Sequence, residues 1–316
     1  MKCAIVFVHG RGVKPPKDVY FKIWLASLHE RVAPEVRADL NISCSMGYYA
    51  DVFYSPTSVA GGAEKQAQGN VLSTLLDRFA RDVIPERSAL AASVVANPEN
   101  DAFLFLEDVI KYFAWNYNGV VAKPVVEALD AVSQDDTSIM VISHSLGTMV
   151  MYDVLTEHPY KIDTWITLGA PLGWTQNVWA RTPQNLVSCI QNLDSVAAVL
   201  DRTVLSFLRA REENPTAPAI GPSPRMEFPA PSEQYPNSAT VQRWINVNDP
   251  ADPVAALDPY LADDFPMPDG SLRAMDVRVD NPDKRPGDKG SAHSDPGYLR
   301  TWQVGQIVSD FLLRHR

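Results

Sequence analysis

An apolar run that ends in a serine between small residues is the feature of this chain that most restricts its fold. Residues 138–150 read as an apolar strand, a tight turn around Ser145 and the start of a helix. Such a turn leaves no room for a large side chain two residues before or after the serine, and these positions hold Ser143 and Gly147. The turn lifts the serine hydroxyl above the sheet, toward the N-terminal amides of the following helix. The pattern predicts a nucleophile at Ser145 and an oxyanion donor in the amide of Leu146.

A second apolar run, at residues 3–8, predicts another buried parallel strand. The segment after it, His9-Gly10-Arg11-Gly12, contains two glycines that let the main chain approach a bound molecule closely. We expect the amide of Arg11 to be the second oxyanion donor, with that of Gly12 as the alternative. We expect His9 to brace this loop.

A serine nucleophile needs a carboxylate that orients its base, and the loop after a later strand supplies two candidates. Residues 241–248 read as the strand, and the loop that follows holds Asp249 and Asp252. We favour Asp252 as the acid because the turn at Pro250 gives the chain room to aim this carboxylate, whereas Asp249 can cap the turn. Asp249 stays open as the alternative acid.

The base is expected one strand further on. Residues 274–280 predict a strand, and the glycine-rich loop after it carries His293. We expect His293 to be the general base. His144 directly precedes Ser145, and we expect it to point to the opposite side of the turn, where it packs and forms hydrogen bonds.

These motifs follow one another in an order that resembles the α/β-hydrolase superfamily, in particular its lipase-like and carboxylesterase-like members. The resemblance spans nearly the whole chain and is carried by His9-Gly10, the elbow at residues 143–147, and residues 168–173, 249–254 and 292–294. One departure is Ser143, where the family has glycine. The resemblance implies an α/β fold with a mostly parallel central sheet flanked by helices.

The resemblance also implies a serine esterase that hydrolyses a carboxylic ester or a related acyl bond through a covalent acyl-enzyme. In that mechanism neutral His293, oriented by Asp252, takes the proton of Ser145, and activity falls once acid protonates the histidine. Two alternatives stay open: a silent binding or sensing protein with the same fold, and thioesterase, amidase or lyase chemistry on the same scaffold.

Predicted strands alternate with predicted helices along the chain, which indicates a mostly parallel sheet. Apart from the elements already given, we expect helices at residues 19–32, 120–132 and 146–157, a largely helical insertion at about 60–117, and strands within 42–54 and at 163–168. The hydrolase core is predicted over residues 1–172 and 240–316.

Between the two parts of the core, residues 173–239 predict a helical, proline-rich cap. We expect Leu172, Trp174 and Trp179 to line a substrate pocket beneath it. The alternative is a surface segment that never touches substrate.

Composition limits the partners of this chain. Its 316 residues, 46% of them hydrophobic, suit one α/β domain with insertions, and a net charge of −10 disfavours nucleic acid as a partner. No metal is expected, since the aspartates at 249, 252, 263 and 264 lack histidines at ligand spacing. A dinucleotide cofactor is disfavoured because the third glycine of its fingerprint would fall on Pro15. We therefore expect a small-molecule acyl ester as the partner and no cofactor, and leave the oligomeric state open.

Neither a secretory signal nor a membrane-spanning segment is evident in the sequence. The apolar stretch at the N-terminus begins at once and leads directly into His9 and Gly10. These features predict a cytoplasmic location.

Overall fold

The computed structural model describes residues 2–40, 44–53, 119–133, 136–172, 241–255, 259–263, 265, 274–287 and 289–316. The chain divides into two compact units, of which the first comprises Met1–Ala50, Gly119–Trp174 and Pro229–Arg316, and the second Asp51–Asn118 and Thr175–Phe228. Nearly all described residues belong to the first unit. The helical insertion expected at about 60–117 and the cap expected at 173–239 lie outside the described residues.

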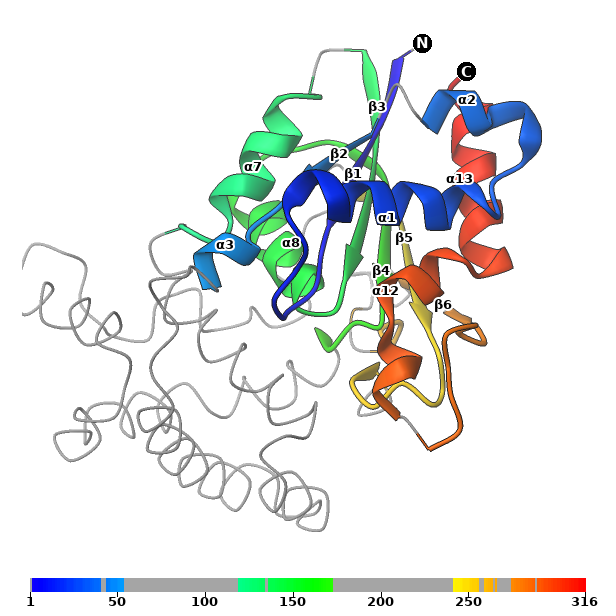
Figure 1. Ribbon diagram of the computed structural model, residues 1–316. Coiled ribbons are helices and arrows are strands. Elements are labelled where there is room, and N and C mark those ends of the chain that lie inside the picture. The colour runs from blue at the N-terminus through cyan, green and yellow to red at the C-terminus, as the bar shows by residue number, and fades with distance from the viewer. Residues whose placement is uncertain are drawn as a thin grey trace, which may run out of the picture. The chain divides into compact units, whose positions relative to one another are not determined.

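The first unit is built on a sheet of six strands in which every pairing is parallel (Figure 1). The strand order is β2-β1-β3-β4-β5-β6. The strands are β1 (Lys2–Val8), β2 (Cys44–Gly47), β3 (Thr137–His144), β4 (Ile162–Leu168), β5 (Val241–Asn248) and β6 (Ala274–Arg278). The predicted α/β class with a mostly parallel sheet is confirmed.

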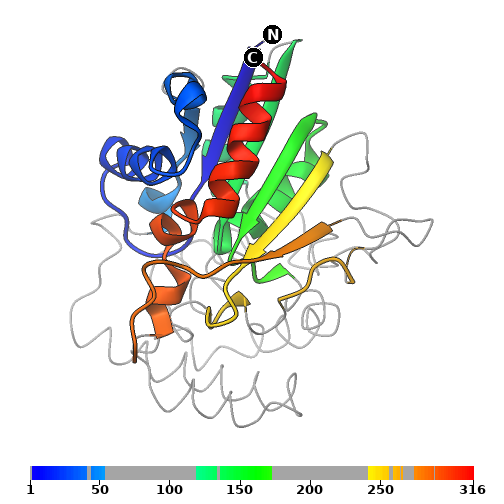
Figure 2. The same ribbon diagram turned by 90° about the vertical axis from the view of Figure 1, so that its right-hand side faces the viewer.

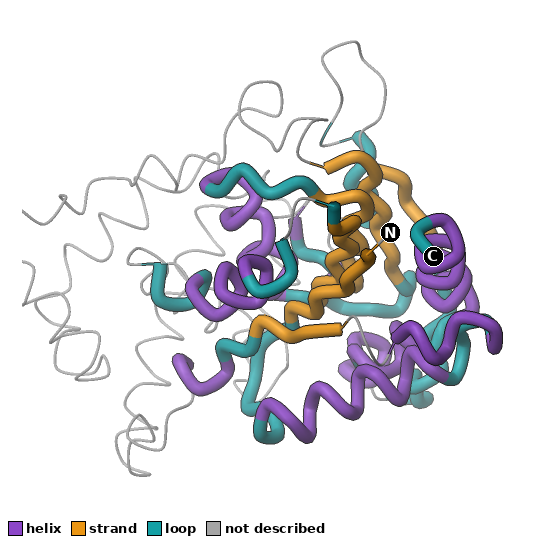
Figure 3. The backbone as a smooth tube through the Cα atoms, turned by 90° about the horizontal axis from the view of Figure 1, so that it is seen from above, coloured by secondary structure: helices purple, strands orange, loops and turns teal. Residues whose placement is uncertain are grey.

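Helices cover both faces of this sheet, as expected for strands that are apolar on both sides (Figure 3). Helices α1 (Lys17–His29), α12 (Asp295–Leu299) and α13 (Trp302–Arg314) lie on one face, and α7 (Lys123–Asp130) and α8 (Leu146–Glu157) lie on the other. Shorter helical segments are η1 (Pro34–Val36), α2 (Arg37–Leu40), α3 (Ala50–Phe53) and η6 (Lys289–His293). Within the described part of the chain, no helix is both long and apolar enough to cross a membrane.

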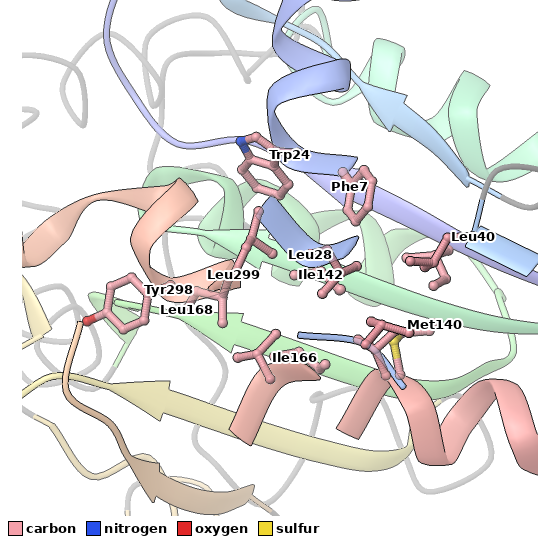
Figure 4. Packing of buried hydrophobic residues seen from close by; sticks show 14 of the residues in the cluster. Phe7, Trp24, Leu28, Leu40, Met140, Ile142, Ile166, Leu168, Tyr298 and Leu299 are labelled. Atoms are coloured by element: carbon pink, nitrogen blue, oxygen red, sulfur yellow. The ribbon is translucent and has the colours of Figure 1, made fainter. Parts of the chain in front are cut away.

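Alternate residues of the strands build a core cluster with α1, α12 and α13 (Figure 4). Trp24 and Leu28 of α1 meet the sheet next to Phe7 of β1, and all three side chains are fully buried. Burial of each such side chain contributes about 1.5–3 kcal/mol. The core therefore fixes α1 and α12, and with them the loops at their ends, against the central strands (Figure 2).

Helix α8 approaches the sheet unusually closely at its first turn. A Cβ atom at Gly147 would lie 2.3 Å from the carbonyl oxygen of His9 and 2.6 Å from that of Val8. Only glycine lets the helix start this near to the end of β1. The beginning of α8 and the end of β1 thus meet at one point.

Predicted element boundaries agree with the structure for some elements and differ for others. The helix predicted at 19–32 spans Lys17–His29. The helix at 146–157 and the strand at 241–248 have the predicted bounds. The helix predicted at 120–132 is shorter, Lys123–Asp130, because Pro124 fits only its first turn. The strand predicted at 274–280 ends at Arg278, where its partner β5 ends at Asn248.

Parallel pairing brings the carboxyl ends of the strands to one edge of the sheet. Val8 is in register with Ser143, and Leu168 with both His144 and Val247. After β1 the chain forms β2 on one side of β1, and it then forms β3 on the other side of β1. The point between β1 and β3 is therefore a topological switch point. Binding crevices of open α/β sheets form at such points.

Candidate active site

Ser145 lies between β3 and α8 in a strained conformation. Its φ of 52° is the one positive value at a non-glycine position in the described part of the chain. Such a conformation costs about 1–3 kcal/mol and persists only where the surroundings hold it. Here the amide of Ser145 donates to the carbonyl of Leu168 at 3.0 Å, and its carbonyl accepts from the amide and hydroxyl of Thr148. Its own hydroxyl does not cap α8 and stays available for a distant partner.

That partner is His293, at the end of η6. Its Nε2 atom lies 2.7 Å from Oγ of Ser145, and its Nδ1 atom lies 2.8 Å from Oδ2 of Asp252. An ionised carboxylate can only accept, so Nδ1 carries the proton and Nε2 is the acceptor for the serine hydroxyl. The imidazole is held in the tautomer that a general base for Ser145 requires.

Asp252 is fully buried and receives four hydrogen bonds. Its Oδ1 atom accepts from the amides of Val254 at 2.8 Å and Ala255 at 3.2 Å, and its Oδ2 atom accepts from His293 and from the hydroxyl of Tyr298 at 2.6 Å. Burial by itself raises the pKa of this carboxyl, but His293, Tyr298 and the amide of Val254 outweigh it, so the pKa is lowered from 3.8. Asp252 is therefore an anion beside the imidazole at neutral pH.

Asp249, the alternative acid, points elsewhere. Its Oδ1 atom accepts from the amide of Ala251 at 2.7 Å, and its Oδ2 atom from the amide of Asn281 at 2.7 Å and from Lys284 at 3.2 Å. It ties the loop after β5 to the segment after β6. The structure brings Asp252, and not Asp249, to His293.

Gly169, directly after β4, lies against the contact between Asp252 and His293. Its φ is +54°, and a Cβ atom there would lie 2.6 Å from Oδ2 of Asp252 and 3.1 Å from Nδ1 of His293. Any side chain at this position would displace the carboxylate or the imidazole.

The two predicted oxyanion donors follow adjacent strands. The amide of Leu146 belongs to the first turn of α8, whose N–H groups have no acceptor within the helix. Gly10 lies so close to the elbow that a Cβ atom there would lie 2.9 Å from Cβ of Ser145. The main chain at Gly10 is therefore next to the serine side chain, and the predicted donor Arg11 and its alternative Gly12 follow it directly in the chain.

His9 fixes the direction of this main chain. Its Nε2 atom accepts from the amide of Tyr49 at 3.0 Å, so its Nδ1 atom carries the proton and donates to the carbonyl of Gly10 at 2.6 Å. In a trans peptide the N–H points opposite to the C=O, so the N–H of Arg11 points away from the His9 ring. Burial, the largest effect, lowers the pKa of His9 to about 3, and the ring stays neutral.

His144 differs from its prediction in two respects. Its ring lies against that of His293, with 4.6 Å between the ring centroids, and not on the far side of the elbow. Neither of its nitrogens makes a well-formed hydrogen bond with the described residues. Burial, and then the nearby His293 and Lys14, lower the pKa of His144 well below 6.5. It is a packing residue that lies between Gly10 and His293, and its burial keeps the ring neutral.

Ser143, two residues before Ser145, has a structural role. Its hydroxyl accepts from Nε1 of Trp165 at 2.8 Å. The hydroxyl explains why serine stands here, since a smaller glycine would leave the buried indole N–H without this partner.

The loop that carries His293 is anchored through Asp295 of α12. This buried carboxylate accepts from the hydroxyl of Tyr20 and from Nε1 of Trp24 at 3.2 Å, both on α1, and pairs with Lys14 at 3.7 Å. Lys14 belongs to the loop after β1. The loop of His293 and the predicted oxyanion loop are thus joined by one buried polar cluster.

Sequence reasoning did not assign roles to Tyr298, Gly169 or Asp295. Tyr298 contacts Asp252 across 46 positions of the chain, and Asp295 contacts Tyr20 across 275. Among these, only Gly169 carried a signal, because a glycine directly after a buried strand indicates a sharp turn or a close approach.

The predicted pocket residues are covered in part. Leu172 is fully buried, and Trp174 and Trp179 lie outside the described residues. Within the described ranges, no group of three or more His, Cys, Asp or Glu side chains is arranged to hold a metal ion.

Comparison with known proteins gives a distant similarity. No protein-family model matches the chain, and no curated protein matches it. A solved structure of a protein with unknown function from Staphylococcus aureus subsp. aureus Mu50 is similar with 13% sequence identity and a TM-score of 0.34. That similarity covers 99% of this chain and 89% of the other.

Proposed function

We propose that the chain is a serine hydrolase of the α/β-hydrolase fold that cleaves a carboxylic ester or a related acyl bond. One observation carries the proposal: the hydroxyl of Ser145, the imidazole of His293 and the carboxylate of Asp252 are joined by hydrogen bonds of 2.7 and 2.8 Å. The expected tautomer of His293 and the strained backbone of Ser145 support it further.

In the first half of the reaction, Nε2 of His293 takes the proton from Oγ of Ser145 while Oγ bonds to the acyl carbon. The carbonyl oxygen becomes an oxyanion, and the amides of Leu146 and Arg11 stabilise it. When the tetrahedral intermediate collapses, the bond from the acyl carbon to the leaving oxygen breaks, and the leaving oxygen takes the proton from His293. The acyl group stays on Ser145.

In the second half, water replaces the alcohol. His293 takes a proton from the water as its oxygen bonds to the acyl carbon, and returns the proton to Oγ of Ser145 as the carboxylic acid leaves. Asp252 stays ionised and stabilises the imidazolium that forms in each half. No net proton is consumed by the enzyme.

A fluorophosphonate probe tests the nucleophile, and p-nitrophenyl esters of graded chain length test turnover. The wild type is expected to be labelled once, at Ser145, and to hydrolyse at least one ester. Ser145→Ala should lose labelling and lower kcat by about three orders of magnitude or more. Ser143→Ala is the matched control, since it removes a buried hydroxyl two residues away that contacts Trp165 and not His293.

The outcomes separate the alternatives. Labelling without turnover of any ester, thioester or amide would point to a silent binding protein that retains the serine. Equal ester hydrolysis by the wild type and Ser145→Ala would overturn the proposal.

A further inference from the structure

The hydroxyl of Tyr298 connects the two aspartates of the loop after β5. It accepts a hydrogen bond from the amide of Asp249 at 2.9 Å and donates one to Oδ2 of Asp252 at 2.6 Å. Because the amide can only donate and the carboxylate can only accept, the hydroxyl proton points to Asp252. Tyr298 is fully buried.

This hydroxyl shares one carboxylate oxygen with the base. Oδ2 of Asp252 accepts from both Tyr298 and Nδ1 of His293, whereas Oδ1 accepts from the two amides of Val254 and Ala255. A donor on the same oxygen withdraws part of the negative charge that would otherwise stabilise a protonated imidazole. Tyr298 therefore competes with His293 for the charge of Asp252.

The position of Tyr298 also fixes the geometry of this contact. It lies on α12, whose N-terminus is capped by Ser294, the residue directly after His293. The same short helix thus carries the base at its N-terminal side and holds the acid from its C-terminal part. Burial, and then the adjacent Asp252, raise the pKa of Tyr298 well above 10, so it stays a neutral donor.

We propose that Tyr298 is a positioning residue that acts through Asp252: it holds the carboxylate in line with His293 and limits how strongly the carboxylate favours the protonated base. This inference rests on the proposed function for its effect on catalysis, but its effect on the proton affinity of the imidazole does not depend on turnover.

The groups that face this pair come from several elements. They are Ser145 and His144 at the elbow, Asp249 and Asp252 after β5, Tyr298 on α12, and Lys14 and His9 beside His144. A variant that changes only the Tyr298 hydroxyl leaves all the others in place, so a change in the titration of His293 can be assigned to it.

The direct test is the titration of His293 in isotope-labelled protein by NMR, in the wild type and in Tyr298→Phe. Without the hydroxyl, Asp252 gives more of its charge to the imidazolium, and the midpoint for His293 should move to higher pH by about half to one unit. The low-pH limb of kcat/KM should move in the same direction, and kcat should fall about tenfold at its plateau, with KM within twofold.

Tyr160→Phe is the control. The hydroxyl of Tyr160 also donates to an aspartate, Asp130 at 2.7 Å, but it lies just before the amino end of β4, at the opposite edge of the sheet from Asp252. It should leave the midpoint for His293 unchanged. An equal shift in both variants would reduce Tyr298 to a structural residue.

A second variant keeps the shape of the side chain and should shift the midpoint for His293 in the opposite direction. Site-specific 3-fluorotyrosine at position 298 has a more acidic hydroxyl and is a stronger donor to Asp252, so the midpoint should move to lower pH. Unchanged midpoints in Tyr298→Phe and in the fluorinated protein would overturn the inference. Should the wild type hydrolyse no acyl substrate, the proposed function fails, and the NMR titration still decides the role of Tyr298.

Discussion

At the scale of the residue, the candidate site depends on a glycine, which has no side chain. Gly169 leaves just enough space for Oδ2 of Asp252 and the ring of His293. Gly169→Ala should push these groups apart and lower kcat by about a hundredfold or more, because small displacements of positioned groups cost this much. The measurement is kcat for the most reactive p-nitrophenyl ester.

Gly119→Ala controls for backbone strain in this prediction. Gly119 also has a positive φ, 67°, but nothing lies within 4 Å of its added Cβ atom. It should cost about 1–2 kcal/mol of stability, as a left-handed residue with a side chain does, with kcat unchanged. If both variants kept full activity, the close approach of Gly169 would be irrelevant to the chemistry.

The two aspartates of the loop after β5 should respond differently to the same change. Asp252→Asn removes the negative charge and allows the wrong tautomer of His293, so kcat should fall by about three to four orders of magnitude. Asp249→Asn keeps Asp252 in place and should cost about 1–3 kcal/mol of stability, because the amide of Asn281 and Lys284 lose their acceptor. Steady-state kinetics and urea unfolding distinguish the two, and equal kinetic losses would contradict the assignment.

The site residues that could be predicted from the sequence are those that lie in a local sequence pattern. Ser145 lies in a recognisable turn, and the loops after two predicted strands supplied His293 and the pair Asp249 and Asp252. The choice between Asp249 and Asp252 depends on the direction in which each side chain leaves the loop. The turn at Pro250 favoured Asp252, but the sequence could not determine this direction. Tyr298 had no local pattern at all, since its role arises only when α12 packs beside the loop after β5.

At the scale of the element, the short helix α12 is stable only through its contacts. Its five residues are too few for a helix to form alone. Asp295 joins it to Tyr20 and Trp24 of α1 and to Lys14. Asp295→Ala should lower the free energy of unfolding by about 1–3 kcal/mol, because buried donors lose their acceptor.

The same variant should lower kcat, since the loop of His293 loses its attachment to α1. Asp280→Ala is the control, because its side chain is 86% exposed and pairs with Lys284 at the surface. It should change stability by less than about 0.5 kcal/mol. Urea unfolding of both variants checks the prediction, and similar losses in the two would contradict it.

Element boundaries show where local pattern stops being sufficient. The alternation of residues 274–280 continues past Arg278, but the strand ends there because β5, its partner, ends at Asn248. The amide of Val279 still donates to the carbonyl of Asn248, and the chain then leaves the sheet. A pairing limit of this kind is set by another part of the chain, so no window of the sequence contains it.

At the scale of the whole molecule, the candidate site is assembled from the carboxyl ends of neighbouring parallel strands. The elbow follows β3, the predicted oxyanion loop follows β1, Gly169 follows β4 and Asp252 follows β5. The strand order and register fix these positions before any side chain is considered. The strained serine is retained because packing from several strands and α8 holds it, which ties the geometry of the site to the stability of the unit.

This dependence gives the molecule a predictable sensitivity to acid. His9 and His144 are buried and neutral, with the pKa of His9 lowered from 6.5 to about 3 and that of His144 lowered well below 6.5, in both cases mainly by burial. Below pH 6.5 the unfolded chain binds protons at these histidines while the folded chain does not. The free energy of unfolding is therefore not reduced by these histidines above pH 6.5, and it falls as the pH decreases toward about 3.

For each pH unit below the pKa of the histidine in the unfolded chain, each of the two residues should lower the free energy of unfolding by about 1.4 kcal/mol. Urea unfolding between pH 7.5 and 5.0 measures this slope, and His144→Gln should reduce it by the contribution of one group while His9 still titrates. A free energy of unfolding that stays level over this range would mean that the folded protein accepts a proton at both of these rings. The ring of His144 lies against that of His293, so protonation of His144 would place a positive charge beside the proposed base and would affect the candidate site as well as the stability of the fold.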